Sequence, residues 1–344
     1  MFSFFRKKPP AQARINGESV AVQAGETLLH AALRHGIDFP HSCRVGGCAS
    51  CKCRLVSGQV RELTETSYIL SDEELDAGFI LACQSVPRGE VEIEVDLAAQ
   101  QGHQRVRGRV VDQQRLTHDI TRLVVQLEQS LPYRAGQYAE LSFDLLPQHA
   151  RSFSFATRQQ PDAQVSFFVR QVPGGVLTSA LHSRALVGES VTLAGPLGDF
   201  YLRPASAPLL LVAGGSGLAP ILALLEEALA TGGERPVTLL FGARAQRDLY
   251  ALEQIRELAG QWNAPFNFVP VLSDAALDTS WGGLRGQVTA QIGQHLVGAV
   301  HAYLCGPPGM IDRAIEVLLN AGVAREHIHF DRFTTLPVPA TASV

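Results

Sequence analysis

The segment Cys43-Arg-Val-Gly-Gly-Cys48-Ala-Ser-Cys51 is the most informative part of this chain. Its three cysteines have the spacing C-x4-C-x2-C, and Cys83 follows after 31 intervening residues. This is the ligand pattern of plant-type [2Fe-2S] clusters, in which each of the two irons takes two thiolates. The two glycines of the loop, at positions 46 and 47, let the backbone fold closely around the inorganic core. The spacing therefore predicts a [2Fe-2S] cluster with the ligands Cys43, Cys48, Cys51 and Cys83.

Zinc and disulfide bonds are the alternatives for these thiols. A zinc site usually repeats a pair of closely spaced ligands, whereas here three cysteines share one loop and the fourth stands alone. Disulfides are typical of short secreted chains, whereas four of the six cysteines of this long chain form one patterned cluster. A metal cluster in a reducing cytoplasm follows. Cys53 does not keep the spacing, and we expect it to be a packed side chain.

The regions around the cysteine loop predict the first domain. A length of 344 residues predicts two or three domains. Residues 14–22 and 91–95 alternate like strands, and residues 27–35 have helical spacing. We therefore expect an α+β module over residues 13–97. Residues 98–104 lack periodicity and large apolar side chains, which predicts a linker.

The rest of the chain predicts two more domains. Residues 105–204 contain runs of β-branched and aromatic residues separated by turn signals, which favours an antiparallel β-barrel. Its predicted strands include 107–111, 121–127, 137–143 and 165–170. Residues 205–334 contain four strand–helix repeats, which predict a parallel, doubly wound α/β sheet. These repeats are 209–213 with 221–230, 237–241 with 249–258, 266–272 with 288–296, and 299–304 with 310–319.

Composition excludes several classes of protein. The chain is 46% hydrophobic and 18% charged with a net charge of −4, so no nucleic-acid partner is expected. No apolar stretch reaches the roughly 18 residues that span a bilayer. Residues 1–10 place three Phe before their basic residues, unlike a secretory signal. We expect disordered tails at 1–12 and 335–344, with membrane-surface contact as the alternative for the first.

The cysteine pattern, with Cys83 in the sequence Leu-Ala-Cys-Gln-Ser, resembles the ferredoxin module of bacterial oxygenase reductases. This group of the ferredoxin-NADP reductase superfamily includes the naphthalene dioxygenase and toluene monooxygenase reductases, and the likeness extends from about Arg14 to Phe333. It implies a multidomain protein with a β-grasp ferredoxin domain, an FAD-binding β-barrel and an NAD-binding domain. It also implies an iron-sulfur flavoprotein oxidoreductase that takes part in electron transfer.

Arg151-Ser152-Phe153-Ser154 resembles the Arg-x-Tyr-Ser motif with which the superfamily holds flavin. A guanidinium can pair with a diphosphate, an aromatic ring can lie against the isoalloxazine, and the Ser154 hydroxyl can hydrogen-bond near the flavin N5. Phe153 stands where the family usually has Tyr, so the phenolic hydrogen bond is lost.

A second segment of the barrel is a candidate for the FAD pyrophosphate. The residues concerned are Gly174, Gly175, Val176 and Thr178. They open a helical run whose N-terminus suits an anion, and a glycine turn that merely caps the helix is the alternative. Their distance from Arg151 resembles that in the FAD-binding members of the family. Phe168, Val169 and Arg170, at the end of the preceding strand, complete the predicted flavin site.

Two strand ends are candidates for the nicotinamide site. Gly214-Gly215-Ser216-Gly217, with Pro220, connects an apolar strand to an apolar helix, so a pyrophosphate can approach the backbone there. The spacing is not that of the usual Rossmann fingerprint. Cys305-Gly306-Pro307-Pro308 resembles the Cys-Gly-Pro motif of the superfamily, which implies that Cys305 lies near the hydride-donating carbon. A buried structural thiol is the alternative for Cys305.

The C-terminal segment Asp331-Arg332-Phe333 resembles the Glu-x-Tyr ending of plant-type reductases. The resemblance implies that Asp331 lies at the flavin edge and that Phe333 covers the ring. With Ser154 and Cys305, these two residues make up the predicted catalytic set. The alternative is that Phe330 and Phe333 only seal the edge of the sheet.

The choice of dinucleotide depends on charges beyond the second and third strands of the α/β domain. Arg244 and Arg247 could bind the 2′-phosphate of NADPH. NADPH-using relatives commonly have Arg where this chain has Asp274, whose charge would repel a phosphate. We therefore expect NADH.

The resemblance implies an order of electron transfer. A nicotinamide gives two electrons as a hydride and the cluster accepts one, so a flavin is needed between them. We expect a monomer that passes electrons from NADH through FAD and the cluster to a Rieske dioxygenase of aromatic hydrocarbon catabolism, to which the Val172-Pro-Gly-Gly segment points. The alternative acceptor is a di-iron monooxygenase, hydroxylase or desaturase, to which the His329-Phe-Asp-Arg-Phe ending points. A non-catalytic redox sensor would need a regulatory or DNA-binding motif, and the sequence contains none that we recognise.

Overall fold

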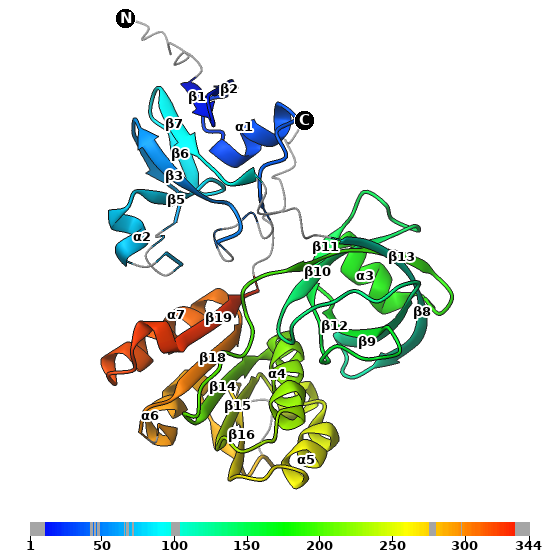
Figure 1. The fold of residues 1–344 in the computed structure, drawn as a ribbon. Helices are drawn as coiled ribbons and strands as arrows, with labels where there is room; N and C mark the ends of the chain where they lie inside the picture. Colours follow the sequence, from blue (N-terminus) through cyan, green and yellow to red (C-terminus); the bar gives the residue numbers. More distant parts are fainter. Residues whose placement is uncertain are drawn as a thin grey trace, which may run out of the picture. The chain divides into compact units, whose positions relative to one another are not determined.

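The computed structural model describes residues 11–41, 44, 46, 49–64, 66, 69–70, 72–97, 104–274, 280–296 and 298–333. They form two compact units, one within residues 11–97 and the other within residues 104–333 (Figure 1). The second unit holds two sheets, one antiparallel and one parallel. The predicted multidomain architecture is confirmed.

The first unit is the β-grasp module. Its main sheet has the order β2-β1-β7-β3-β5, in which β1 and β7 are parallel, and β4 pairs with β6 beside it. Its elements are β1 (Ala11–Ile15), β2 (Glu18–Val22), α1 (Leu28–Arg34), β3 (Lys52–Ser57), β4 (Val60–Glu62), α2 (Asp72–Asp76), β5 (Phe79–Leu81), β6 (Ser85–Pro87) and β7 (Val91–Glu94).

Two predictions for the start of this unit have different outcomes. The strand predicted at 14–22 is a hairpin, because Asn16 and Gly17 have φ angles of +48° and +87°, as a two-residue turn of the primed type requires. The helix predicted at 27–35 is confirmed as α1, whose N-cap is the Thr27 side chain.

The barrel domain is an antiparallel sheet of order β11-β10-β13-β8-β9-β12. A bridge between Phe155 and Phe167 joins the two outer strands, so the sheet is nearly closed. The elements are β8 (Gln104–Arg115), β9 (Ile120–Leu127), β10 (Tyr138–Phe143), β11 (Arg151–Ser154), β12 (Gln164–Arg170), α3 (Val176–Ser183) and β13 (Ser190–Leu197). The predicted strands correspond to β8, β9, β10 and β12, whereas β13 was not predicted.

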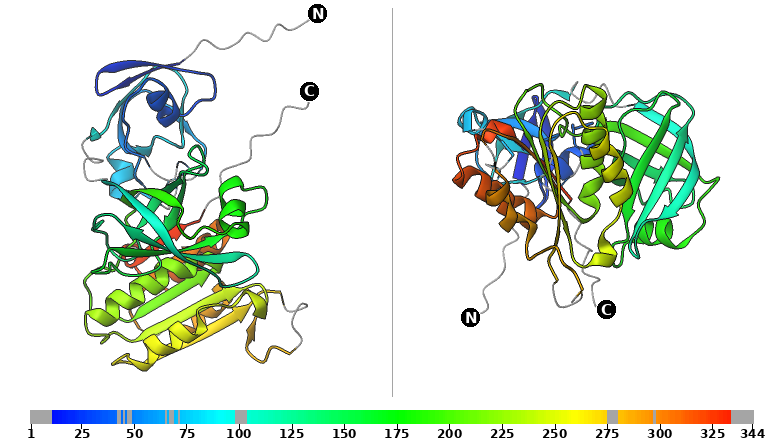
Figure 2. Two further views of the ribbon diagram at one scale, coloured as in Figure 1. Left: turned by 90° about the vertical axis from the view of Figure 1, so that its right-hand side faces the viewer. Right: turned by 90° about the horizontal axis from the view of Figure 1, so that it is seen from below.

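The α/β domain has a parallel sheet of order β17-β16-β15-β14-β18-β19. α4 and α5 cover one face of it, and α6 and α7 cover the other (Figure 2). Its strands and α-helices are β14 (Leu209–Gly214), α4 (Leu218–Ala230), β15 (Val237–Ala243), α5 (Leu252–Gly260), β16 (Phe266–Leu272), β17 (Leu284–Arg285), α6 (Ile292–His295), β18 (His301–Gly306), α7 (Pro308–Asn320) and β19 (Ile328–Arg332). The chain adds strands on one side of β14 and then on the other, so a topological switch point lies between β14 and β18. Ligands of doubly wound sheets bind at such a point.

The helix predicted at 288–296 is present only in part as an α-helix. The segment forms the 3-10 turn η5 (Val288–Gln291), followed only by the single turn α6. Thr289 and Gly293 lie within it, and both residue types have low helix propensity. The other predicted helices are present as α4, α5 and α7, whereas the short edge strands β17 and β19 were not predicted.

One buried core joins the barrel to the α/β domain. Phe168 of the barrel packs edge-on against Tyr250 with ring centroids 5.5 Å apart. Phe200 does the same against Tyr303 at 6.0 Å. All four side chains belong to one buried apolar cluster, which also contains the inner face of α4. This packing holds the barrel against the α/β domain.

The ends of the predicted domains differ slightly from the elements. Ala11 and Gln12, predicted as tail, belong to β1, and Gln104, predicted as linker, opens β8. The remainder of both tails and of the linker lies outside the described residues. No helix in the described part of the chain combines the length and the apolar character needed to cross a membrane.

Candidate functional site

Two of the four predicted cluster ligands can be placed in the first unit. Cys51 and Cys83 are 3% and 4% exposed, and the backbone N–H of Cys83 donates to Sγ of Cys51 at 3.4 Å. The Cys51 sulfur therefore lies against the backbone of Cys83, although 32 positions separate the two residues. Cys43 and Cys48 lie outside the described residues.

A glutamine lies against the predicted ligand Cys83. The Gln84 side-chain Nε2 lies 3.5 Å from the Cys83 Sγ and donates to the Cys83 carbonyl at 3.0 Å. Its Oε1 accepts from the Thr64 hydroxyl at 3.2 Å, which fixes the orientation of the amide. Gly46 lies against it, since a Cβ there would stand 2.8 Å from the Gln84 Cγ. A close-fitting glycine loop and N–H donors aimed at sulfur suit a negatively charged iron-sulfur cluster.

The spare Cys53 is a packed side chain, as expected. It is 1% exposed and belongs to the apolar core of the first unit. Burial, with a smaller contribution from Cys83, raises the pKa of the Cys53 thiol to about 12. A neutral thiol in an apolar core is a structural one.

The flavin motif of the barrel is strand β11. Arg151 and Ser152 are exposed, Phe153 is half-buried, and Ser154 is 6% exposed. Arg151 donates to the carbonyl of Ala150 at 2.7 Å and has no carboxylate partner in the described chain, so its guanidinium can receive a diphosphate. The ring of Phe153 packs partly against the barrel core.

The glycine turn before α3 has a specific geometry. Gly174 has a φ of +74°, and Gly175 is the N-cap of α3. The Thr178 hydroxyl accepts from the backbone N–H of Val172 at 3.1 Å and closes the turn. A Cβ on Gly175 would stand 2.5 Å from the Thr178 Oγ1, so this position has no room for a side chain. Val176 at the start of the helix is 52% exposed and leaves the helix N-terminus open to an anion.

The three residues predicted at the end of β12 have different surroundings. The side chain of Val169 is fully buried in the barrel core, so only its backbone is available to a cofactor. Phe168 faces the α/β domain. The guanidinium of Arg170 donates from Nε to Asp119 Oδ2 at 3.0 Å. Its Nη1 lies 3.3 Å from the position of a Cβ on Gly215, so this arginine reaches the nucleotide loop.

The two nicotinamide motifs meet at the switch point. A Cβ on Gly217 would lie 2.2 Å from the Cys305 carbonyl oxygen, and one on Gly306 would lie 3.2 Å from the Cα of Gly214. The loop Gly215–Gly217 is the 3-10 turn η2, and the Tyr250 hydroxyl donates to the Gly215 carbonyl at 2.9 Å. Ser216 lies half-buried in this turn, and Pro220 is in the first turn of α4. Pro307 is the N-cap of α7, and Pro308 is its first residue. These backbone approaches form a close-fitting cradle at the ends of β14 and β18, which suits a dinucleotide.

Cys305 and the C-terminal motif lie beside this cradle. Cys305 is fully buried, and burial, together with the charge of Asp331, raises the pKa of its thiol well above the ordinary value. Asp331 pairs with Cys305 in the β18–β19 ladder and accepts from the Ser154 hydroxyl at 3.4 Å. The backbone N–H of Phe333 donates to the Gly306 carbonyl at 2.9 Å. The four predicted catalytic residues are thus gathered where the barrel meets the α/β domain.

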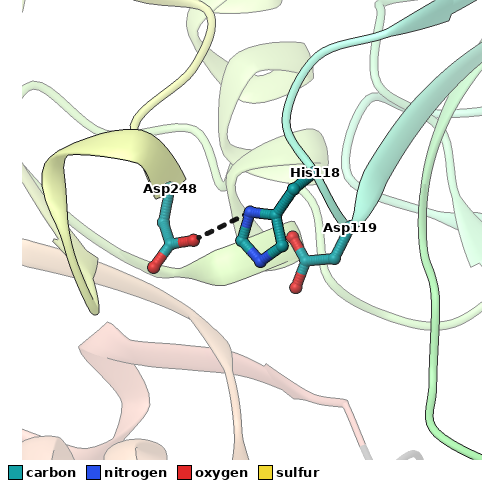
Figure 3. Close-up of side chains that lie close together, drawn as sticks. All are labelled: His118, Asp119 and Asp248. Carbon is teal, nitrogen blue, oxygen red and sulfur yellow. Dashed lines mark ion pairs between the residues drawn. The ribbon is translucent and has the colours of Figure 1, made fainter.

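Arg244, the candidate for a 2′-phosphate, is engaged by carboxylates. Its Nη2 lies 3.0 Å from Asp119 Oδ2 and 3.2 Å from Asp248 Oδ1. His118 approaches the same Asp248 oxygen at 3.4 Å, and its ring lies between the two carboxylates (Figure 3). Arg247, in the 3-10 turn η3 (Gln246–Asp248), is exposed and outside this network.

Comparison with known proteins finds the same three modules. Residues 13–88 match a 2Fe-2S iron-sulfur cluster binding domain, residues 107–201 an oxidoreductase FAD-binding domain, and residues 211–316 an oxidoreductase NAD-binding domain. These domains and the site define an iron-sulfur flavoprotein oxidoreductase that uses a [2Fe-2S] cluster, FAD and a nicotinamide dinucleotide.

Similar whole proteins define the family. The xylene/toluene monooxygenase electron transfer component XylA of Pseudomonas putida is 40% identical, over 98% of this chain and 99% of that protein. The ferredoxin–NAD(P)(+) reductase component of the naphthalene 1,2-dioxygenase system of Pseudomonas putida is 35% identical, over 92% of this chain and 96% of that protein. Among solved structures, the ferredoxin reductase in carbazole 1,9a-dioxygenase has a TM-score of 0.68 at 28% identity, covering 94% of this chain and 98% of the other. The chain belongs to the family of electron-transfer reductase components of oxygenase systems.

Three residues of the site were missed from the sequence. Gln84 could have been found, because it directly follows a predicted ligand. Asp119 and Tyr250 carry no such signal. Asp119 gains its importance from its contact with Arg244 of the α/β domain, and Tyr250 from its packing against Phe168 of the barrel and its hydrogen bond to the Gly215 carbonyl.

Proposed function

We propose that this chain carries electrons from NADH through FAD and its [2Fe-2S] cluster to a Rieske dioxygenase that acts on aromatic rings. The proposal rests on one observation. A single chain combines a domain for a nicotinamide, which donates two electrons, a domain for FAD, and a domain for a [2Fe-2S] cluster, which accepts one electron. Bound FAD supplies the chemistry that converts one hydride into two single-electron transfers. A relative that matches nearly the whole chain is the reductase component of the naphthalene 1,2-dioxygenase system.

The residues of the second unit would orient the two reacting rings. The glycine cradle around Gly214 and Gly306 would hold the dinucleotide at the switch point. The buried Ser154 and the half-buried Asp331, with Cys305 beside them, would line the space in which flavin and nicotinamide meet. The apolar cluster that contains Cys305 would help to keep water from this space, which would protect the hydride from side reactions.

Two observations support NADH as the donor. Asp274 is exposed, and its backbone N–H donates to the Arg244 carbonyl at 2.9 Å, so an acid stands beside the predicted 2′-phosphate position. An acid there suits a ribose hydroxyl and repels a phosphate. Arg244 already has two carboxylate partners.

Anaerobic rapid mixing tests the proposed path. NADH mixed with reconstituted protein should bleach the flavin first and the cluster next, and added oxidised Rieske oxygenase should then be reduced. Cys83→Ser is the control, since it removes one ligand and should block electron delivery to the oxygenase while leaving flavin reduction in place. Flavin bleaching without cluster reduction in the unmodified protein would refute the path.

A di-iron monooxygenase is the second candidate for the acceptor. The observation that favours it is the 40% identity to the electron transfer component of a xylene/toluene monooxygenase. Reduction of the two terminal oxygenases, assayed in parallel with one preparation, distinguishes the candidates by their rates. We further expect the protein to be a cytoplasmic monomer, and light scattering of the holoprotein tests its oligomeric state.

A further inference from the structure

A compact ion-pair network joins the barrel to the nucleotide side of the α/β domain. Asp119, in the turn between β8 and β9, accepts from Arg170 and from Arg244 at 3.0 Å each, and from the Thr117 hydroxyl at 2.9 Å. Asp248, in η3, receives the second contact from Arg244 and caps the backbone N–H of Ala245 at 3.0 Å. One guanidinium is therefore shared between carboxylates of two domains.

The network is balanced in charge, and its carboxylates are mostly enclosed. Two arginines face two carboxylates, and the side chains of Asp119 and Asp248 are only 15% and 10% exposed, whereas that of Arg244 is 52% exposed. Burial raises the pKa of Asp119, but the Thr117 hydrogen bond and the charge of Arg170 outweigh it, so this pKa lies below its ordinary value. His118, Asp119 and Asp248 lie close enough together to resemble a metal site (Figure 3). The two guanidinium groups already neutralise the carboxylates, which argues against a cation there.

The position of Arg244 gives the network its significance. Arg244 directly follows β15, the strand next to the one that carries the Gly214 loop. In doubly wound dinucleotide-binding domains, the group at this place meets the 2′ position of the adenosine ribose, where an arginine receives the phosphate of NADPH. An arginine that is already engaged receives it poorly, because a phosphate would have to take Arg244 from two enclosed carboxylates.

We propose that Asp119, a residue of the flavin barrel, determines the preference for NADH over NADPH by engaging the Arg244 guanidinium. The inference rests on the proposed use of NADH and assigns the selection to a residue of the neighbouring domain. Asp119 is thus a specificity-determining residue that acts through Arg244.

The primary test is Asp119→Asn in the holoenzyme. Asparagine keeps the size and an acceptor oxygen but removes the charge. The ratio of kcat/KM for NADPH to that for NADH, measured with ferricyanide as acceptor, should rise roughly tenfold, the value expected for one charge-assisted hydrogen bond. Affinity for 2′,5′-ADP, measured by calorimetry, should rise by a similar factor while affinity for 5′-ADP changes little. Loss of the Asp119 charge also changes the surroundings of Arg170. Any resulting change in pyrophosphate binding is the same for NADH and NADPH, so it cancels in the ratio.

Matched variants decide the outcome. Asp112→Asn removes an exposed carboxylate on the same hairpin that pairs with Arg122, and it should leave the ratio unchanged. Arg244→Gln added to Asp119→Asn should return the ratio to that of Arg244→Gln alone. An unchanged ratio in Asp119→Asn, or a rise that persists in the double variant, would overturn the proposal.

If Asp119→Asn does not load flavin, Asp248→Asn removes the second carboxylate from the same guanidinium and gives the same test. Failure of NADH to reduce the unmodified flavin would instead refute the proposed function itself.

Discussion

The Ser154 hydroxyl lies 3.4 Å from a carboxylate oxygen of Asp331, although 177 positions separate the two residues. Ser154 ends β11 of the barrel, and Asp331 lies in β19 of the α/β domain opposite Cys305 of β18. This contact joins the predicted flavin motif of the barrel to the C-terminal segment of the α/β domain, which was predicted to lie at the flavin edge. The proposed function predicts that this hydroxyl and this carboxylate orient the flavin edge during hydride transfer.

Ser154→Ala should slow flavin reduction by NADH roughly 10- to 100-fold, because it removes the buried hydroxyl expected near the flavin N5. Rapid mixing at the flavin absorbance measures this rate at saturating NADH. Ser142→Ala, on the adjacent strand β10, is the control and should reduce flavin at the unmodified rate. Equal rates of flavin reduction in Ser154→Ala and in the unmodified protein would show that the Ser154 hydroxyl has no role in the reaction.

Gln84→Leu should lower the reduction potential of the cluster. The amide N–H aimed at the Cys83 sulfur stabilises the more negative, reduced cluster, so its loss favours the oxidised form. We expect the equilibrium between flavin and cluster to shift about tenfold toward the flavin, which corresponds to about 59 mV for one electron. Spectroelectrochemical titration measures the potential directly. Gln59→Leu, an exposed position of the same unit, should leave it unchanged.

Motifs with a fixed local chemistry were predictable from the sequence. The cysteine spacing, the glycines before α4 and the Cys-Gly-Pro segment each require particular residue types at particular offsets, whatever surrounds them. The structure gives the physical reason for one of these glycines. A Cβ added to Gly217 would stand 2.2 Å from the Cys305 carbonyl oxygen, so no larger residue fits there. Long periodic elements such as α4 and β16 were predictable for the same reason, since their pattern is local.

Long-range features were not predictable. The role of Asp119 depends on arginines that lie 51 and 125 positions away, and no spacing rule connects them. Val169 was grouped with Phe168 and Arg170, although strand alternation turns its side chain into the barrel core. The short strand β17 pairs through only two residues and has no apolar pattern of its own. The hairpin at Asn16-Gly17 could have been predicted from the sequence, because this dipeptide is a strong turn signal.

Gly217→Ala should abolish tight dinucleotide binding. The added Cβ would stand 2.2 Å from the Cys305 carbonyl oxygen, so either the η2 turn or the end of β18 must move. Overpacking of this kind costs about 1–3 kcal/mol of stability and displaces the backbone that faces the pyrophosphate. Calorimetric titration with 5′-ADP and thermal unfolding measure the two effects. Gly309→Ala in α7 meets no atom within 4 Å and should stabilise the helix, which separates crowding from a general effect of alanine.

His329 should make the α/β domain sensitive to acid. Burial, followed by the charge of Arg203, lowers the pKa of His329 to about 4, below the value of roughly 6.5 in an unfolded chain. As the pH falls below 6.5, His329 binds a proton in the unfolded chain, whereas in the folded chain it stays neutral until about pH 4. The stabilisation is therefore complete above pH 6.5 and is lost between there and pH 4, by roughly 2–3 kcal/mol.

The substitution His329→Phe tests this assignment, because it keeps a ring beside Tyr303, whose centroid lies 4.8 Å away, and removes the titrating nitrogens. Urea unfolding at pH 7 and pH 5 can be followed by tryptophan fluorescence, since both tryptophans, Trp262 and Trp281, belong to the α/β domain. The variant should lose less stability on acidification than the unmodified protein. His149→Phe, in the loop between β10 and β11, should lose as much as the unmodified protein. If His329→Phe loses as much stability on acidification as the unmodified protein, other groups cause the acid sensitivity. His301 is the nearest candidate, because burial lowers its pKa as well.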